Sequence, residues 1–206
     1  MSNVLVAKKT KVKDDDLKYV IACQDGNTEA FEILVEKHQK KMLNIAFRMM
    51  GDYDEACDVT QEAFIAAYKS IRKFKAESKF STWLYRIVIN HSKNRLKQIS
   101  GIIKQESISL DDSEEALAAD IFNQSLISCT NPGVQLEDRE RDTQIQKCIT
   151  SLDEEYRDVL VLRDIQGFSY EEISDILNIP DGTVKSRLSR ARNMLKDFLV
   201  KVIGEI

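Results

Sequence analysis

The sequence predicts an all-α protein of two small helical domains, joined by an acidic flexible linker, with a helix-turn-helix in the second domain. Apolar residues recur mainly at spacings of three and four, and no alternating apolar and polar stretch is long enough for a strand. The 206 residues include only two prolines, and the 43% hydrophobic content is sufficient for globular cores. This length suits one large domain or two small ones.

Charge is unevenly distributed along the chain, whose formal net charge is −4. Lys and Arg outnumber Asp and Glu by 18 to 13 in residues 1–100, whereas acids dominate by 9 to 2 in residues 101–140 and by 12 to 10 in residues 141–206. Helical periodicity is lost in the acidic middle, which indicates a linker. The predicted parts are an amino-terminal extension (1–25), a first domain (26–100), an acidic linker (101–137) and a second domain (138–206).

Helical periodicity predicts three helices in the first domain and four in the second. The first begins after Asn27-Thr28 and ends at Gly51, where glycine suits a left-handed C-cap. The others are expected at residues 54–73, 81–99, 138–150, 153–165, 170–177 and 183–202.

Targeting, membrane and metal signals are missing from the sequence. No apolar run approaches the 18 residues of a membrane span, and the amino-terminal segment has no apolar signal-peptide core, so we expect a cytosolic protein without stable membrane insertion. Cys23, Cys57, Cys129 and Cys148 show no CxxC spacing, and the two histidines are distant from them in sequence. We therefore expect reduced thiols, no metal site and no cofactor.

Residues 169–196 predict two helices joined by a tight turn. Ser169 and Glu172 have the spacing of a capping box, and from Val184 an apolar stripe continues through Leu188 and Leu195. The opposite side carries Lys185, Ser186, Ser189, Arg190 and Asn193, flanked by Arg187 and Arg192. These donors and hydroxyls suit base edges and phosphates. The alternative is a solvated basic face on an ordinary helix, which the preceding capped helix and turn disfavour.

The helix expected at residues 81–99 combines an aromatic, amides and cations on one stripe. Residues 65–100 hold nine basic residues and one acid. The stripe consists of Trp83, Arg86, Asn90, Asn94 and Lys97, a composition typical of surfaces that stack on an unpaired base and hydrogen-bond its edge. Leu84, Ile87, Val88 and His91 lie about a quarter-turn away and are expected to pack. The alternative is that Trp83 is a core aromatic, and His91 is expected as a core histidine.

The helix expected at residues 54–73 has an acid and amide face formed by Asp58, Gln61, Glu62 and Ile65. Its opposite face has small residues for close packing. The acid and amide face is either solvated surface or a protein-docking patch, and periodicity alone favours the former.

Three motifs resemble the extracytoplasmic-function sigma factors, the two-domain class of the bacterial sigma-70 family. They are residues 58–64 (DVTQEAF), residues 79–87 (KFSTWLYRI) with Asn90 and Asn94, and residues 170–173 (YEEI) followed by residues 182–192 (GTVKSRLSRAR). The resemblance implies a non-catalytic specificity subunit that binds core RNA polymerase, recognises and melts promoters of a stress or envelope-response regulon, and is controlled by an anti-sigma factor.

The resemblance also implies three sets of contact residues and a path for the linker. Core polymerase would bind Asp58, Gln61, Glu62 and Ile65. The single-stranded minus-ten element would contact Phe74, Ser78, Phe80, Trp83, Arg86, Asn90, Asn94 and Lys97. The duplex minus-thirty-five element would contact Thr183, Lys185, Ser186, Arg187, Ser189, Arg190 and Arg192. The acidic linker would run through the cationic RNA channel of the polymerase.

Two features separate this chain from the family pattern. Lys75 and Ala76 follow Phe74 where family members often have Arg and Gly, which affects the shape of the base pocket. Residues 1–25 exceed what the family usually needs and have no assigned role.

The sequence leaves two rival classes of protein. A response regulator or other helix-turn-helix repressor would leave the helix of residues 81–99 and the acidic linker without a role. A DNA-processing enzyme would need a nucleophile or a carboxylate metal cluster, and no such set stands in a suitable context.

Overall fold

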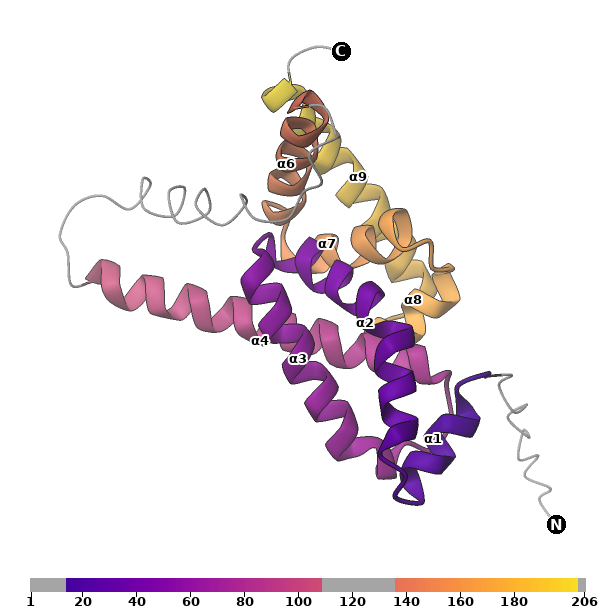
Figure 1. Ribbon diagram of the computed structural model, residues 1–206. Helices are drawn as coiled ribbons and strands as arrows, with labels where there is room; N and C mark the ends of the chain where they lie inside the picture. Colours follow the sequence, from indigo (N-terminus) through magenta and orange to yellow (C-terminus); the bar gives the residue numbers. More distant parts are fainter. Residues whose placement is uncertain (1–13, 109–135, 204–206) are drawn as a thin grey trace.

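The protein folds into two groups of helices that pack against each other (Figure 1). The computed structural model describes residues 14–108 and 136–203. Within these residues all regular secondary structure is helical, which confirms the all-α class. Most of the expected acidic linker, residues 101–137, lies outside the described residues. None of the helices in the described ranges combines the length and apolarity of a membrane span.

The first group is built around three long helices whose apolar faces meet in one core. The helix α2 ends at Gly51, whose φ of 78° forms the predicted left-handed C-cap. Asp52 caps the next helix by accepting a hydrogen bond from the Glu55 N–H at 2.9 Å. The elements are α1 (Leu17–Gln24), α2 (Glu29–Met50), α3 (Tyr53–Ser70), the 3₁₀ turn η1 (Ile71–Lys73) and α4 (Phe80–Ile108).

The second group contains the predicted helix-turn-helix. The Glu172 N–H donates to Ser169 Oγ at 3.1 Å and the Ser169 N–H donates to Glu172 Oε2 at 3.0 Å, which completes the predicted capping box. The helix expected at residues 153–165 is an α-helix followed by a π-helical segment. The elements are α6 (Leu136–Thr150), α7 (Glu154–Leu160), η2 (Val161–Ile165), α8 (Tyr170–Leu177) and α9 (Asp181–Ile203).

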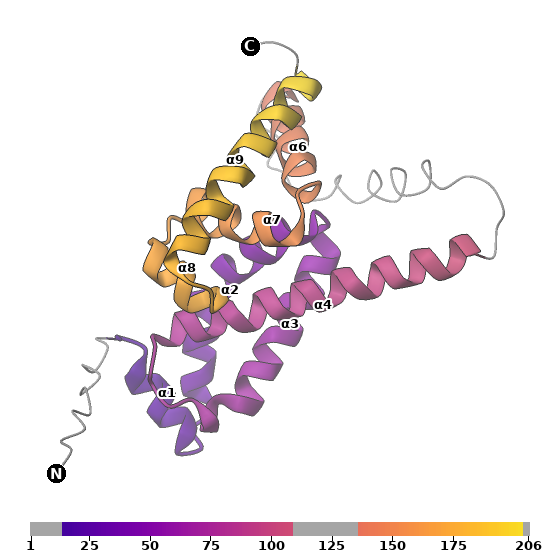
Figure 2. The same ribbon diagram turned by 180° about the vertical axis from the view of Figure 1, so that it is seen from behind.

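The two groups share one apolar core and a buried ion pair. The helix α8 packs on the first half of α4, whereas the second half of α4 extends away from the body (Figures 1 and 2). Lys93 of α4 contacts Asp158 and lies 3.2 Å from a carboxylate oxygen of Glu154 on α7. Asp158 is 3% exposed and its Oδ1 has no hydrogen-bond partner. Burial outweighs the attraction of Lys93 and raises the pKa of Asp158 to about 6.

The second group also supplies hydrogen bonds to the carboxyl end of α2, where the last carbonyls of a helix lack i+4 partners and where, among the described residues, the N–H of the C-cap glycine bonds only the Phe47 carbonyl. The side chain of Gln146 donates to the Phe47 and Arg48 carbonyls at 3.3 and 3.2 Å. Arg157 donates to the Met49 carbonyl at 2.8 Å. These bonds fix the second group against α2.

Three boundaries differ from the sequence prediction. The sequence places residues 17–24 in an extension, whereas α1 packs on α2 and η1 and belongs to the first group. The helix α4 continues to Ile108, beyond the expected end near Ile99. The helix α9 begins at Asp181, inside the expected turn, because the Pro180 carbonyl accepts hydrogen bonds from the N–H groups of Thr183 and Val184.

Candidate nucleic-acid interface

The outer face of α9 presents polar side chains above a buried apolar stripe. Val184, Leu188 and Ala191 are at most 2% exposed, so the helical phase is the expected one. The opposite face holds the exposed Lys185, Ser186, Ser189 and Arg190, whereas Thr183 is half-buried. Arg190 makes no hydrogen bond or ion pair within the part of the chain that the structure describes, so its guanidinium is available to a ligand.

Carboxylates of the same domain hold the two arginines at the flanks of this face. Arg187 lies 2.6 Å from a carboxylate oxygen of Glu155 on α7. Arg192 donates two hydrogen bonds to Asp164 of η2, at 2.6 and 2.9 Å, and this pairing raises the pKa of the guanidinium. These contacts orient the flanking arginines, while Arg190 remains unrestrained.

On α4, four of the five stripe residues are exposed to solvent. Asn90, Asn94 and Lys97 follow one another along the exposed side of the helix. Trp83 is half-buried, and its ring centroid lies 5.1 Å from that of Phe74. One face of α4 therefore combines two amides and a cation with the exposed part of an indole.

The aromatic cluster behind the loop of residues 74–80 corrects two of the predicted base contacts. Phe80 is fully buried and Phe74 is 8% exposed, because both rings pack with Trp83 in the core of the first domain. Neither ring is presented to a ligand. Within the loop, Ser78 is half-exposed, and Ala76 has a φ of 55°, a left-handed conformation that costs a non-glycine residue energy.

The remaining stripe residue, Arg86, contacts the second domain. Its guanidinium donates to the carbonyls of Asp175 and Ile176 at the end of α8, at 3.2 Å for the bond to Ile176. Next to it, Tyr85 is buried and lies edge-on to Phe168 at 4.7 Å. Arg86 therefore ties α4 to the end of α8 while its side chain stays exposed.

His91 is not the core histidine that the sequence predicts. It is half-exposed, and its Nδ1 lies 3.6 Å from Glu62 of α3. The turn of α4 brings this ring beside the acidic face of α3, a neighbour that local periodicity does not reveal.

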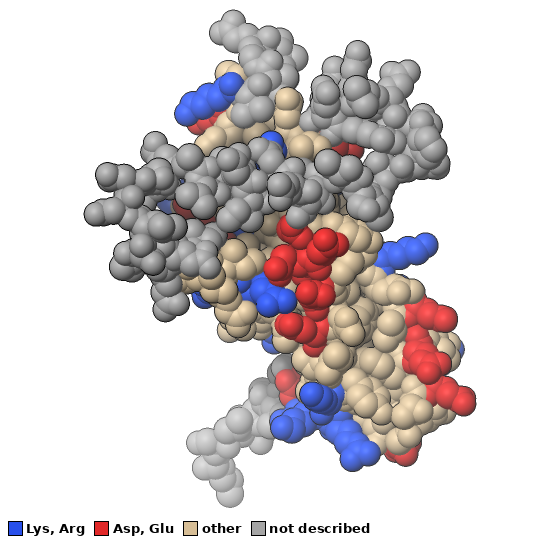
Figure 3. Space-filling model, turned by 60° about the vertical axis from the view of Figure 1, so that its left-hand side comes forward, with Lys and Arg blue, Asp and Glu red and all other residues tan. Residues whose placement is uncertain are grey.

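The acid and amide face of α3 surrounds one arginine from α4. The Nε of Arg95 lies 2.8 Å from Glu55, and its Nη2 lies 3.6 Å from Asp58 and 3.8 Å from Glu62. Figure 3 shows acidic side chains in a band over α3 and basic side chains gathered below it. Beside Arg95, the side chains of Asp58 and Glu62 stay more than half exposed.

An apolar groove adjoins this acidic face and includes the other two predicted docking residues. Gln61 and Ile65 lie on its wall, and Phe31, Val35 and Tyr68 contribute to its lining. Its volume is about 750 Å³. The 46% exposure of both Ile65 and Tyr68 makes this groove an apolar surface available to a protein partner.

Comparison with known proteins identifies the family. Residues 34–101 match sigma-70 region 2, and residues 142–195 match sigma-70 region 4. The RNA polymerase sigma-H factor of Pseudomonas aeruginosa is 35% identical over 193 residues, which cover 94% of this chain and 98% of that protein. The ECF RNA polymerase sigma factor SigW of Bacillus subtilis is 36% identical over 88% of this chain and 95% of its own length.

Solved structures agree with this relationship. CnrH, in complex with the cytosolic domain of CnrY, superposes with a TM-score of 0.62 at 25% identity over 91% of this chain and 98% of that one. The sigma factor RpoE of Bartonella quintana, in complex with the anti-sigma factor NepR, shares the fold with a TM-score of 0.63 at 23% identity over 85% of this chain and 99% of that one. The chain belongs to the extracytoplasmic-function class of sigma-70 RNA polymerase sigma factors and serves transcription initiation.

Several structurally important residues are missing from the sequence prediction. Asp14 and Gln24 bond to the ends of the loop of residues 74–80, Arg95 partly neutralises the docking face, and the pair of Lys93 and Asp158 joins the domains. Each depends on contacts between distant segments. Within residues 14–102 and 142–201, no group of three or more His, Cys, Asp and Glu side chains is arranged to hold a metal ion.

Proposed function

We propose that this sigma factor is a non-catalytic specificity subunit that joins core RNA polymerase in the cytoplasm and reads two promoter elements with two separate faces. The observation that carries the proposal is the pair of polar, basic faces on α4 and α9, each lying over a buried apolar stripe. One face has amides beside an indole, which suits unpaired bases. The other has cations and hydroxyls on a single helix, which suits the major groove.

The minus-ten element contacts the exposed side of α4 and the loop of residues 74–80. Asn90 and Asn94 offer amides to the edges of an unstacked base, and Lys97 offers charge to the backbone. The exposed part of Trp83 provides a stacking surface, which is worth about 1–3 kcal/mol per base. Phe74 and Phe80 support the indole from inside the core.

The minus-thirty-five element contacts the outer face of α9 in the major groove. Arg190, Lys185 and the serine hydroxyls of this face are the base-reading set. Arg187 and Arg192, which carboxylates already orient, lie at the edges where phosphates pass.

Core polymerase docks on the groove between α2 and α3 and on the acidic face beside it. Gln61 and Ile65 line the groove, and Asp58 and Glu62 supply charge at its edge. A helical partner with an apolar stripe and basic flanks fits this combination of surfaces. In RpoE of Bartonella quintana the partner in the solved structure is an anti-sigma factor, and we propose a partner of that class for this chain as well.

Promoter binding requires the two domains to separate. The centres of elements at positions −10 and −35 are about 85 Å apart on straight duplex, since the rise is about 3.4 Å per base pair. In the structure α8 packs directly on α4, and Arg86 is bonded to it. Residues 109–135 span at most about 90 Å when extended, at about 3.3 Å per residue, which is sufficient for this separation.

Run-off transcription with purified core polymerase tests the proposal. The chain is added to core polymerase on a library of genomic fragments, and transcripts are mapped. We expect initiation from a small set of fragments that share two elements upstream of the start, and none with core polymerase alone. Tight binding of the chain to promoter duplex without polymerase, with no transcript from any fragment, would support a repressor instead.

A further inference from the structure

We propose that residues 14–24 are a positioning brace, which fixes the loop of residues 74–80 and thereby sets the base preference at the minus-ten element. The inference rests on the proposed role of this loop in capturing a base. It gives a function to a segment that the sequence leaves without one. The brace contacts both ends of the loop, by two independent sets of hydrogen bonds.

Gln24, at the end of α1, holds the start of the loop. Its Nε2 donates to the carbonyl of Ile71 at 2.9 Å and to the carbonyl of Phe74 at 2.9 Å. One amide therefore joins the last 3₁₀ turn to the first residue of the loop. The Ile71 carbonyl also accepts from the Phe74 N–H at 3.1 Å, so removing the Gln24 donor would leave the Phe74 carbonyl without this partner and weaken the hold on the start of the loop.

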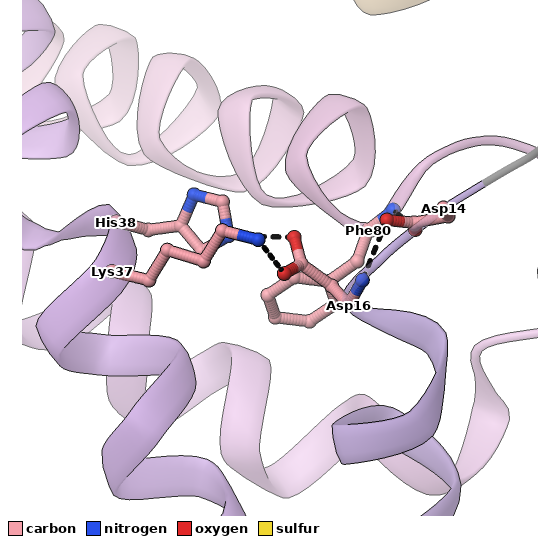
Figure 4. A network of polar contacts seen from close by, with 5 residues as sticks. All are labelled: Asp14, Asp16, Lys37, His38 and Phe80. Carbon is pink, nitrogen blue, oxygen red and sulfur yellow. Dashed lines mark hydrogen bonds and ion pairs between the residues drawn. The ribbon is translucent and has the colours of Figure 1, made fainter.

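Asp14 holds the other end of the loop (Figure 4). Its Oδ2 accepts a hydrogen bond from the Phe80 N–H at 2.6 Å, at the start of α4. The first turn of α4 contains no acidic residue, and Lys79, which precedes the helix, is not a capping residue type. A residue 66 positions away thus supplies the cap and the negative charge that this helix end favours.

Asp16 anchors the brace to α2. Its carboxylate is buried, lies 2.8 Å from Nε2 of His38 and accepts a hydrogen bond from Lys37 (Figure 4). Burial alone would raise the pKa of Asp16, but the hydrogen bonds from Lys37 and His38 outweigh it and lower the pKa. The ring of His38 packs on Phe80 at 5.7 Å, so the anchor and the capped helix end touch the same aromatic cluster.

The consequence is a loop held at both ends with a strained residue between them. Between Phe74 and Phe80 the chain turns through Ala76 in its left-handed conformation, and Phe74 and Phe80 both contact Trp83. A site whose backbone is preorganised discriminates between ligands because it does not adapt to the wrong one. Loosening either end would let the loop adapt to other bases.

The test measures base preference with the holoenzyme, formed from core polymerase and the full-length chain. Single-stranded oligonucleotides carry each of the four bases at every position of a minus-ten sequence mapped by run-off transcription. We compare Asp14→Ala and Gln24→Ala with Asp14→Asn, which keeps an acceptor for the Phe80 N–H, and with Asp15→Ala. Asp15 is exposed and makes no hydrogen bond among the described residues, so it is the matched control.

We expect Asp14→Ala and Gln24→Ala to lower the preference for the favoured base about five- to tenfold, the equivalent of one lost hydrogen bond, while core affinity stays unchanged. The Asp14→Asn variant should retain most of the base preference of the unmodified chain, and the Asp15→Ala variant should retain all of it. Hydrogen exchange at the Phe80 amide accelerates in Asp14→Ala.

Two outcomes overturn the inference. One is an unchanged base preference in both alanine variants. The other is an equal loss of affinity for all four bases together with a lower melting temperature, which marks a role in stability alone. If the unmodified holoenzyme itself shows no base preference, the proposed role of the loop fails instead.

Discussion

Replacing Ala76 with glycine is expected to stabilise the protein, although glycine usually destabilises. Ala76 has a φ of 55°, and the left-handed region costs a residue with a Cβ about 1–2 kcal/mol that glycine does not incur. Two terms oppose this gain. Glycine gives the unfolded chain more conformational entropy, which destabilises the folded state by about 0.4–1 kcal/mol. Removing the half-buried methyl group also loses part of the roughly 0.8 kcal/mol that burial of one carbon contributes. The net expectation is a stabilisation of about 0.5 kcal/mol.

The matched control is Ala66→Gly within α3. Ala66 is also half-buried, so both substitutions remove a similar methyl group and add the same freedom to the unfolded chain. Only Ala76→Gly relieves strain, whereas Ala66→Gly costs about 1 kcal/mol in a helix interior. The difference between the two free energies of unfolding therefore isolates the conformational term, which we expect at about 1–2 kcal/mol.

Urea denaturation of the full-length chain, followed by circular dichroism, measures both values. A difference of this size corresponds to roughly 2–8 °C in melting temperature for a chain of about 200 residues. Equal destabilisation by the two substitutions would show that Ala76 does not adopt the left-handed conformation in solution. The interpretation of residues 74–80 as a strained loop would then be wrong.

Three further predictions concern the DNA face of α9, the domain interface and the docking face. Arg190→Ala should lower the binding free energy for the correct minus-thirty-five sequence by about 1–3 kcal/mol and reduce base discrimination at one or two positions. Arg192→Ala should instead weaken binding to all sequences alike. Holoenzyme binding to single-base promoter variants separates the two effects, and an equal loss of specificity in both variants would refute the assignment. Because burial raises the pKa of Asp158 to about 6, the protonated carboxyl contributes stability that is present below about pH 4 and is lost as the pH rises through 6. The free energy of unfolding should therefore fall by up to about 3 kcal/mol over this range relative to the Asp158→Asn variant. Parallel pH profiles of the two proteins would contradict this. Glu62→Lys should weaken core binding by several kcal/mol in a titration at fixed salt, whereas the exposed Glu36→Lys on α2 should not; unchanged affinity of Glu62→Lys would remove the docking role.

Local signals in the sequence predict most helices well. The capping box at Ser169 and Glu172 marks the observed start of α8, and Gly51 ends α2 as expected. The apolar stripe from Val184 gives the helical phase of α9. These features depend on residues within one or two turns of each other, which is why the sequence alone reveals them.

What the sequence does not predict depends on contacts between distant segments. The short α1 has no side-chain cap, and its place is determined by Gln24 and by packing on α2. Phe80 is an aromatic residue of the type that stacks on bases, but its ring packs against His38 and Trp83 in the core. Arg86 lies on the predicted stripe, yet its guanidinium is bonded to the end of α8. Periodicity assigns a side chain to a face and does not show what lies opposite.

The central claim is that the exposed side of α4 captures an unpaired base. The rate of promoter opening by holoenzyme that carries the Asn90→Ala variant tests it most directly. The substitution removes an exposed amide from α4 without touching the core. Holoenzyme carrying this variant should form closed complexes normally and open duplex promoter slowly by permanganate footprinting, and a template with a premelted minus-ten bubble should restore transcription toward the unmodified level. Equal loss of transcription on duplex and premelted templates would contradict the account.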